Sequence, residues 1–416
     1  MVKNEKEWQE EISFNDFCNV GSSKRIYYKE YVDSGIPFYR SKEIIMKSQG
    51  KEISECLYIS KEKFEEIKSK YGIPQKGDIL LTAVGTCGIP YLVNEKDYFY
   101  FKDGNLIWLK DIKKDVANNE FILYWLKSSI AKNKIENITI GSVQKALTID
   151  AIKKIKIKLP PLEEQKKIAS VLSSLDDKIE LNNRMNKILE EMAQTIFKEW
   201  FVNFNFPSED GKPYKDSGGK MIESELGAIP EGWKVYKFEN FLTHSTERIL
   251  NIDAPIYSAT NNGICLRDDK FNKNLSKDNS KNKKVLKDYL LFGLSREILN
   301  FGLMTDEIGS VSPVYEIFKI NKNICIPYII EKEIRINMRR YMNILKPASR
   351  EGQSISRDLL LRKSIALPDI KIQNKLMKTI NSIETYIKFN QIENQKLDSI
   401  RDTLLPKLMS GEIKIK

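Results

Sequence analysis

The sequence predicts an α+β fold in which two similar mixed α/β domains are joined by two long antiparallel coiled-coil helices with pseudo-twofold symmetry. Related segments, LPPLEEQ at residues 159–165 and LPDIKIQ at residues 367–373, introduce two helical stretches, and their offset of 208 residues is half of the 416-residue chain. Both stretches carry an apolar seam at alternating steps of four and three residues, which is typical of a coiled coil. A segment long enough for a folded domain precedes each one.

Length and composition favour a globular protein with more than one domain. At roughly 100–200 residues per domain the chain predicts two to four folded units, and its 41% hydrophobic and 30% charged residues are sufficient for true cores. No run approaches the roughly 18 apolar residues of a membrane helix, and residues 1–7 lack the apolar stretch of a secretion signal. We therefore expect a cytoplasmic protein without membrane association. The net charge of +11 is consistent with a polyanionic partner.

Cysteine and histidine usage argues against a metal centre. The five cysteines are scattered without a C-x-x-C pair, so we expect neither disulfides nor a zinc site, and instead buried small residues in a reducing compartment. The single histidine, His244, excludes clustered-histidine sites and is expected to lie in a loop. The chain has neither a phosphate loop nor the Asp- or Asn-Pro-Pro-aromatic tetrapeptide of an amino-methyltransferase. We predict no catalytic residue and no metal ligand.

The first domain is assigned to residues 1–160 and is predicted to be a mixed sheet with a few helices. Apolar runs bounded by glycine and proline predict extended segments at residues 35–39, 76–82 and 85–93. Residues 120–127 predict a helix, and residues 152–159, with period-two alternation at their end, predict a closing strand.

The first long helix is assigned to residues 161–206. Proline at its entrance gives up only a donor that would be unpaired anyway, and Glu163 and Glu164 lie beside the positive end of the helix dipole. A helix of about 40 residues is about 60 Å long. Nine of ten seam positions keep their apolar or asparagine character 208 residues later, and only Ala193 against Arg401 differs. The ten positions are Ile168, Leu172, Leu175, Ile179, Asn182, Asn186, Leu189, Ala193, Ile196 and Trp200.

Asparagine occupies the middle of both seams. A buried asparagine costs stability but penalises misaligned registers. In an antiparallel pair Asn182 would meet Asn394, and Asn186 would meet Asn390. The alternative is a pair of ordinary long core helices, against which the matched asparagine positions argue.

The second half repeats the first in outline. Residues 207–232 are assigned to a polar linker, residues 233–366 to the second domain and residues 367–416 to the second long helix. Residues 254–258 resemble residues 35–39, and residues 287–291 resemble residues 77–81.

A pseudo-twofold molecule suits a ligand with two sites at a fixed distance, and duplex DNA is such a ligand. A spacer of about 60 Å exceeds the DNA helical turn of about 34 Å. Residues 270–287 carry seven lysines, which predicts a loop that neutralises phosphates, although a merely solvated loop is the open alternative.

Base discrimination needs side chains with fixed donors and acceptors, such as Arg for guanine and Asn or Gln for adenine. Candidate DNA contacts near the glycine-rich turns of the first half are Arg40, Lys42, Thr82, Thr86, Ser142, Gln144 and Lys145. Candidates in the second half are Ser258, Thr260, Asn261, Arg267, Lys283, Lys284, Arg296, Arg350, Gln353 and Ser354.

The helical segments also resemble a known family. Residues 159–165, 175–183 and 195–201, the segment ESELGAIPEGW at residues 223–233 and the ending LLPKLMSGEI at residues 404–413 resemble the specificity (S) subunit of type I restriction-modification enzymes, a host-defence system. The resemblance implies two target recognition domains that each read one half of a split DNA sequence, and antiparallel helices that set the spacer.

It also implies protein partners: methyltransferase (M) subunits, expected to be two, and restriction/translocase (R) subunits. S-adenosylmethionine, ATP and Mg are then expected in those partners, and no cofactor in this chain. Two alternatives remain open from the residues alone, a single-chain DNA methyltransferase or nuclease with divergent motifs, and a coiled-coil protein scaffold.

Overall fold

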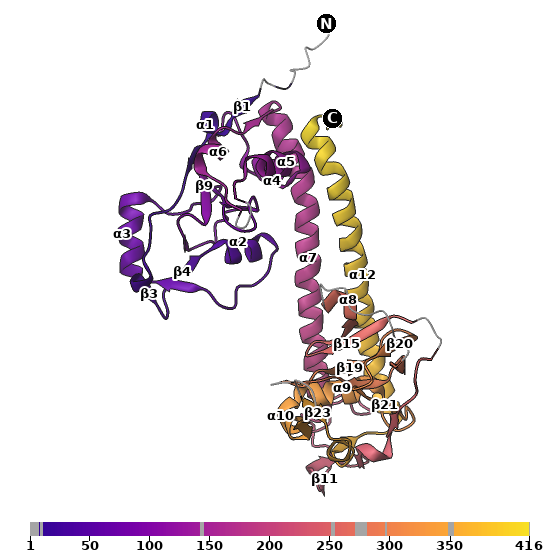
Figure 1. Cartoon of the computed structure of the whole chain (residues 1–416). Helices are drawn as coiled ribbons and strands as arrows, with labels where there is room; N and C mark the ends of the chain where they lie inside the picture. Colours follow the sequence, from indigo (N-terminus) through magenta and orange to yellow (C-terminus); the bar gives the residue numbers. More distant parts are fainter. Residues whose placement is uncertain are drawn as a thin grey trace. The chain divides into compact units, whose positions relative to one another are not determined.

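The computed structural model describes Trp8 and residues 11–141, 145–250, 254–270, 281–295, 298–347 and 353–415 (Figure 1). The chain forms two compact units, Met1–Asn186 with Lys388–Lys416, and Lys187–Ile387. Each unit therefore contains the sheets of one half of the sequence and a part of each long helix. Much of the predicted lysine-rich loop lies outside the described residues, as do the candidates Ser142, Gln144, Arg296 and Arg350.

The described part of the first unit contains two four-stranded sheets and a two-stranded ladder. One sheet has the order β2-β9-β6-β7 and is antiparallel throughout, whereas the other has the order β3-β5-β4-β8 with β4 and β8 parallel. The ladder pairs β1 with β10, directly before the first long helix. The strands are β1 (Ile12–Ser13), β2 (Asn19–Gly21), β3 (Tyr31–Val32), β4 (Ile36–Tyr39), β5 (Leu57–Ile59), β6 (Ile79–Thr82), β7 (Pro90–Leu92), β8 (Tyr100–Phe101), β9 (Leu106–Lys110) and β10 (Lys156–Ile157).

Short helices cover these sheets. Phe121 and Trp125 of α4 pack into the same core as Phe14 and Phe17 of α1, so the apolar face predicted at residues 120–127 is buried. The helices are α1 (Phe14–Phe17), α2 (Ser41–Ser48), α3 (Lys61–Tyr71), α4 (Asn119–Lys127), α5 (Ser129–Ile138) and α6 (Ile149–Lys153), with the 3-10 turn η1 (Tyr28–Glu30).

The second unit repeats the antiparallel sheet and the parallel strand pair of the first, although the outer strands of its mixed sheet are arranged differently. Its sheet β14-β21-β18-β19 is antiparallel throughout, its sheet β16-β15-β20-β17 contains the parallel pair β15 and β20, and β13 pairs with β24 directly before the second long helix. The strands are β11 (Met221–Ser224), β12 (Gly227–Pro230), β13 (Lys234–Lys237), β14 (Leu242–Ser245), β15 (Ile256–Thr260), β16 (Gly263–Leu266), β17 (Lys283–Leu286), β18 (Leu290–Phe292), β19 (Phe301–Leu303), β20 (Ile308–Val311), β21 (Glu316–Ile320), β22 (Leu345–Pro347), β23 (Gln353–Ile355) and β24 (Ser364–Leu367). The helices are α8 (Arg267–Lys270), α9 (Pro327–Ile336), α10 (Met338–Tyr341) and α11 (Arg357–Leu361), with η2 (Phe238–Asn240) and η3 (Met342–Ile344).

The two long helices are α7 (Leu162–Phe201) and α12 (Ile370–Ser410). In the first unit Leu172 from the early part of α7 is buried in one core with Leu408 from the late part of α12. In the second unit Phe197 from the late part of α7 is buried with Leu376 and Ile380 from the early part of α12. The helices are antiparallel in both units, which confirms the predicted fold class.

The asparagines in the middle of the seam bond to each other. Asn182 Nδ2 donates to Asn394 Oδ1 at 2.8 Å, and Asn390 Nδ2 donates to Asn186 Oδ1 at 2.8 Å. These are the two pairs that an antiparallel arrangement predicts. Asn182 Nδ2 also donates to Glu393 at 2.7 Å, and Asn182 Oδ1 accepts from Lys178 Nζ at 3.0 Å, so this buried amide has partners on both helices.

Two local expectations are wrong. The strand predicted over residues 152–159 is confined to β10, because α6 extends to Lys153 and is capped by Thr148, which accepts a hydrogen bond from Ala151 N at 3.2 Å. His244 lies in β14 rather than in a loop, and its Nε2 is 2.7 Å from Glu316 Oε2 on the neighbouring strand β21.

The cysteines are all free, but only Cys18 and Cys325 are buried. The expected burial fails for the other three because of their positions: Cys56 precedes β5, Cys87 lies in the β6–β7 turn, and Cys265 lies on the edge strand β16. Residues 207–232 are not uniformly irregular, since β11 and β12 form a hairpin there. No helix among the described residues is long and apolar enough to cross a membrane.

Candidate nucleic-acid interface

In the first unit the ends of several strands meet at Asn105, whose backbone carbonyl links the loops that follow them. We call this region the edge at Asn105. The Asn105 carbonyl accepts hydrogen bonds from Ser41 Oγ at 3.0 Å and from Ala83 N at 2.8 Å. The loops after β4 and β6 are therefore tied to the turn between β8 and β9. Ser22 Oγ donates to the Leu106 carbonyl at 3.0 Å, which ties in the loop after β2.

The side chain of Thr82, a predicted DNA contact, holds the loop after β6 closed. Thr82 is fully buried, and its Oγ1 donates to the Thr86 carbonyl at 2.6 Å while accepting from Ile89 N at 2.9 Å. Gly88 has a φ of +83°, and a Cβ there would lie 3.1 Å from the Ile135 side chain, so the turn requires glycine. Thr82 thus fixes the base of the loop, while Thr86, which is also a predicted DNA contact, is exposed at its tip.

Arg40 and Lys42 flank the start of α2 at the same edge. Arg40 Nη2 is 2.7 Å from Oε1 of the fully buried Glu43. Desolvation acts to raise the pKa of the Glu43 carboxyl, but the hydrogen bonds from Arg40 hold it below its usual value. Arg40 is thereby committed to an internal ion pair, whereas Lys42 is exposed.

Lys145 joins this edge through its backbone. Its carbonyl accepts from Gly85 N at 3.0 Å, beside the tip that carries Thr86, and its side chain is exposed. The structure therefore brings together Lys42, Thr86 and Lys145 from three separate parts of the sequence. Hydrogen bonds at the edge at Asn105 hold the segments that carry them.

The sequence reasoning missed a basic and aromatic run at this edge. Lys24 and Arg25 are exposed in the loop after β2, and Tyr27 and Tyr28 follow with 59% and 87% of their surfaces exposed. Exposed aromatic rings beside cations are suited to stacking and phosphate contacts. The signal was present as the run KRIYYK at residues 24–29, in which basic residues flank two tyrosines. Lys102, in the turn between β8 and β9, is tied to the end of β4, since its backbone N donates to the Tyr39 carbonyl at 2.8 Å.

The predicted residues of β15 in the second unit serve mainly local structure. Ser258 is buried, and the Thr260 hydroxyl donates to the Gly263 carbonyl at 2.9 Å, which closes the β15–β16 turn. The exposed Asn261 lies at the tip of that turn, and its carbonyl accepts from Arg335 Nη1 at 2.7 Å. Arg267 begins α8 directly after β16.

The remaining predicted residues of the second unit lie elsewhere in its sheets. Lys283 Nζ donates to the Tyr315 carbonyl at 2.6 Å, and desolvation lowers the pKa of this lysine. Lys284 is half-buried on the same strand β17. Gln353 exchanges backbone hydrogen bonds of 2.8 and 2.7 Å with Ser295 in the loop after β18, and Ser354 follows it in β23. This bridge corresponds to the Val84 to Ala146 bridge of the first unit.

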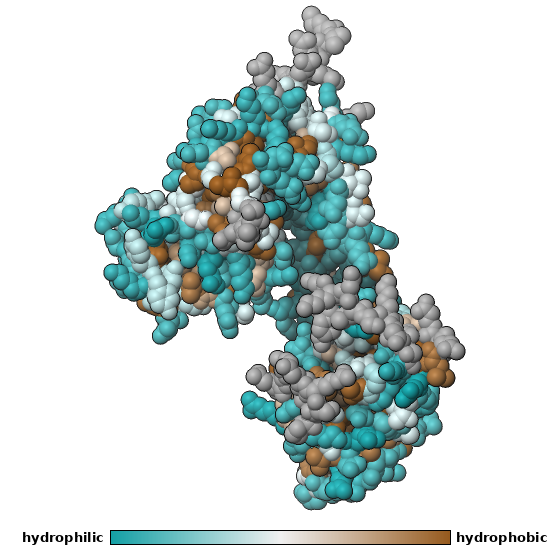
Figure 2. Space-filling view, viewed as in Figure 1, coloured by the Kyte–Doolittle hydropathy of each residue, from teal (hydrophilic) through white to brown (hydrophobic). Residues whose placement is uncertain are grey.

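The visible surface of each unit is mainly hydrophilic, with hydrophobic residues in small groups (Figure 2). Within the described ranges no group of three or more His, Cys, Asp or Glu side chains is placed to hold a metal ion. The chemistry that the edge of the first unit offers is that of cations, hydroxyl groups and exposed aromatic rings on rigid turns. Side chains of these types are suited to contacts with phosphates and base edges.

Comparisons with known proteins agree with this description. A family model described as the type I restriction modification DNA specificity domain matches residues 5–191. The type I restriction enzyme MjaIX specificity subunit of Methanocaldococcus jannaschii is 27% identical over 413 residues, covering 95% of this chain and 90% of the relative. The type I restriction enzyme HindI specificity subunit of Haemophilus influenzae is 21% identical over 401 residues, covering 82% and 87%.

A solved structure shares the fold. The crystal structure of the type I restriction-modification system S subunit from M. genitalium aligns with a TM-score of 0.57 at 16% identity, covering 98% of this chain and 97% of that one. The similarity extends over both units, so the duplicated topology is common to the two proteins.

Proposed function

The chain belongs to the family of type I restriction-modification specificity subunits, and from this premise we propose that it reads a bipartite DNA target with one half-site per recognition domain. The observation that carries the proposal is the duplication of one sheet topology, β2-β9-β6-β7 and β14-β21-β18-β19, each followed by a long helix. Two related but chemically different domains suit two different half-sites. Its DNA target implies the cytoplasm as its compartment.

The first half-site is assigned to the edge organised by Asn105. Lys42, Lys102 and Lys145 would neutralise phosphates there, since Lys42 lies in the first turn of α2 and the other two lie in loops tied to this edge. Thr86 at a rigid turn tip would lie nearest to base edges, because its loop is fixed from below by Thr82.

We propose that the chain has no catalytic role of its own and binds no cofactor. Methylation would be carried out by two methyltransferase subunits that bring S-adenosylmethionine, and cleavage by restriction subunits that use ATP and Mg. The long helices offer apolar side chains for docking. Leu181 and Met185 of α7 and Phe389 of α12 are 40–62% exposed in the first unit, and Ile188, Met192 and Tyr386 are 48–64% exposed in the second. Exposed apolar side chains of this size on long helices favour a helical protein partner.

Domain exchange tests the assignment of half-sites. Residues 1–158 would be replaced by those of another specificity subunit, the chain co-expressed with its methyltransferase partner, and the methylated positions mapped in the host genome. We expect one half-site of the methylated sequence to change and the other to stay. A change in both half-sites, or in neither, contradicts independent reading. Methylation by this chain alone would contradict the non-catalytic role.

A further inference from the structure

The single mismatch between the two seams, Arg401 against Ala193, marks a difference in chemistry between the units. In the first unit Arg401 Nη1 is 2.8 Å from Asp176 Oδ1. The other oxygen of Asp176 accepts from Tyr124 Oη at 2.9 Å and lies 3.3 Å from Lys127 Nζ. Asp176 of α7 thus binds two side chains of α4 and Arg401 of α12. These contacts join the three helices.

The second unit has the same junction without the arginine. The residues 208 positions after Tyr124, Lys127 and Asp176 are Lys332, Arg335 and Glu384. The position equivalent to Arg401 is Ala193, whose side chain ends at Cβ. A pocket of about 630 Å³ opens there, and it is lined by Ala193, Glu384 and residues of α7, α9, β16 and β19.

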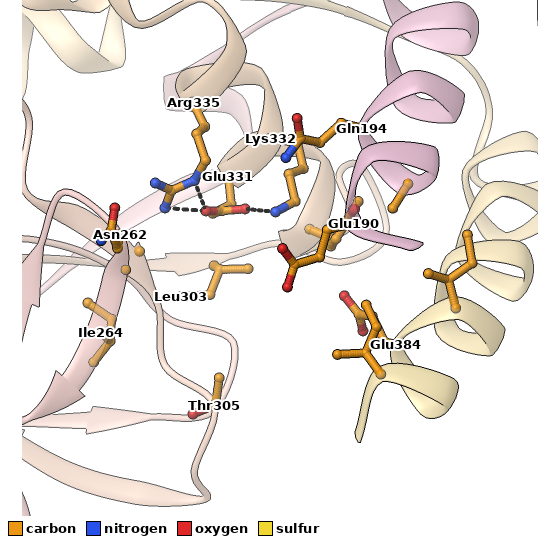
Figure 3. Close-up of a pocket in the computed structure, with 16 residues that line it drawn as sticks. Glu190, Gln194, Asn262, Ile264, Leu303, Thr305, Glu331, Lys332, Arg335 and Glu384 are labelled. Carbon is orange, nitrogen blue, oxygen red and sulfur yellow. Dashed lines mark hydrogen bonds and ion pairs between the residues drawn. The ribbon is translucent and has the colours of Figure 1, made fainter. Parts of the chain in front are cut away.

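The basic residues of the pocket do not replace the missing arginine. Arg335 Nε donates to Glu331 at 2.6 Å, and Lys332 Nζ lies 3.2 Å from the same carboxylate (Figure 3). No ion pair or hydrogen bond between described residues holds the Glu384 carboxylate. In Figure 3, Glu190 from α7 and Glu384 from α12 point toward one another across the opening.

The two equivalent carboxylates differ in electrostatics accordingly. Desolvation alone would raise the pKa of Asp176, but Lys127, Arg401 and Tyr124 together hold it below its usual value. Desolvation raises the pKa of Glu384, and Lys332 only partly opposes this rise. A cation that entered the pocket would give Glu384 the partner that Asp176 already has.

We propose that this pocket binds the guanidinium group of an arginine side chain from the methyltransferase subunit, in the place that Arg401 occupies in the first unit. The part that names the subunit rests on the proposed function. Ile264, Leu303 and Ile383 give the pocket apolar walls that suit the methylene stem of an arginine. A planar fork of donors fits a carboxylate better than an ammonium does.

The exposed apolar residues of α7 do not surround the pocket. Ile188 and Met192 belong to the second unit, but at 3.6 residues per turn they face away from Glu190, Ala193 and Gln194, which line the pocket. A partner that places an arginine in the pocket would cover the opening itself. Its arginine would then be desolvated, which strengthens the ion pair.

The site itself is tested on the full chain with small probes. N-acetyl-L-arginine amide is titrated and the methyl resonances of Ile264, Leu303 and Ile383 are followed by NMR. N-acetyl-L-citrulline amide, which has nearly the same shape without the charge, is the matched control. We expect saturable one-site binding of the arginine probe and at least tenfold weaker binding of the citrulline probe. Equal responses, or no saturation up to about 20 mM, would overturn the site.

Substitutions at the duplicated positions give a reciprocal test. Glu384→Gln should weaken binding of the arginine probe at least tenfold, and Ala193→Arg should abolish it by supplying the guanidinium from within the chain. Arg401→Ala should create a second site in the first unit, which the added change Asp176→Asn should remove. Unchanged probe binding in both Glu384→Gln and Ala193→Arg would contradict the assignment.

The source of the arginine is tested by assembly with the methyltransferase subunit. Ala193→Arg and Glu384→Gln should each weaken assembly at least tenfold, as measured by titration calorimetry. If the arginine probe binds while both variants assemble normally, the site takes a free guanidinium compound and the partner assignment is wrong. If the unaltered chain does not assemble at all, the proposed function fails while the probe result stands on its own.

Discussion

Gln165 and Gln373, which lie 208 residues apart, make the same three hydrogen bonds. Gln165 Oε1 accepts from Asn118 N at 2.8 Å, and its Nε2 donates to the carbonyls of Val116 at 3.0 Å and Pro160 at 2.9 Å. The side chain is 1% exposed. It therefore ties the first turn of α7 to the N-terminus of α4, which belongs to the globular part of the first unit.

Gln373 repeats this arrangement in the second unit. Its Oε1 accepts from Ile326 N at 3.0 Å, and its Nε2 donates to the carbonyls of Ile324 at 2.9 Å and Pro368 at 3.0 Å. Each partner again lies 208 residues after its counterpart. Because both amides are buried and fully bonded, they fix how each long helix leaves its own globular part.

Replacing either glutamine should destabilise its unit. Gln165→Leu would leave a buried backbone donor and two carbonyls without their partner, at a cost of about 1–3 kcal/mol for each group that stays unsatisfied. Gln373→Leu should have the same effect in the second unit. Differential scanning calorimetry would show a lower midpoint for one transition. Gln395→Leu, at an exposed position of α12, is the control and should shift neither transition.

The asparagine pairs should couple energetically. Asn390→Leu alone leaves the Asn186 amide without its partner and should destabilise the first unit, whereas Asn186→Leu with Asn390→Leu removes both polar groups and should recover part of the loss. A double-mutant cycle by urea denaturation should give a coupling free energy of about 0.5–3 kcal/mol. Additive effects of the two single changes would show that the pair does not act as a unit.

Lowering the pH should change the contributions of the equivalent carboxylates Asp176 and Glu384 to the free energy of unfolding in opposite directions. The folded-state pKa of Asp176 lies below its unfolded value, so its charge stabilises the first unit above about pH 4, and this stabilisation is lost as the pH falls through the folded-state pKa. Asp176→Asn should destabilise the first unit at pH 7 by about 1–3 kcal/mol. The folded-state pKa of Glu384 is raised, so its ionisation opposes folding as the pH rises through that value.

Glu384→Gln should therefore raise the unfolding midpoint of the second unit at pH 7, and the gain should vanish below the unfolded pKa of about 4.3. Denaturation between pH 3 and 7 measures both effects. Asp115→Asn, an exposed position in the first unit, is the control. If Glu384→Gln lowers the midpoint at pH 7, Glu384 has a stabilising partner in the folded chain.

The periodic parts of this fold were predictable and the site largely was not. The seam and its asparagine pairs follow from spacing alone, because an antiparallel orientation fixes which seam positions meet. The edge at Asn105 could not be predicted, since it is built by backbone hydrogen bonds between loops far apart in the sequence. Thr82 was selected for its place in a glycine-rich turn, but its hydroxyl is consumed in closing that turn. Tyr27 and Tyr28 were missed because aromatic residues are more often core, and only the structure shows them exposed.

Lengthening both helices by one heptad should alter the unspecified spacer of the DNA target and leave its two half-sites unchanged. A seven-residue insertion in both α7 and α12 preserves the 3.5-residue seam, so the pairing of the helices is retained. Mapping of methylated positions in a strain that expresses the lengthened chain measures the spacer. An unchanged spacer would mean that the helices do not set the distance.

Removing lysines from the edge at Asn105 should weaken DNA binding mainly through its salt dependence. Each phosphate contact releases about 0.9 counterion, so Lys42→Ala with Lys145→Ala should reduce the slope of log K against log salt concentration by nearly 2. The affinity should fall for all sequences alike, because phosphate contacts carry no sequence information.

Lys114→Ala is the matched control. This exposed lysine lies beyond Lys110, at the end of β9 opposite to Asn105, and should change the slope little. Fluorescence anisotropy with a fixed duplex, repeated across salt concentrations, separates the two cases. If Lys114→Ala lowers the slope as much as the double substitution does, DNA lies against the other end of the sheet, and the assignment of the first half-site to the edge at Asn105 fails.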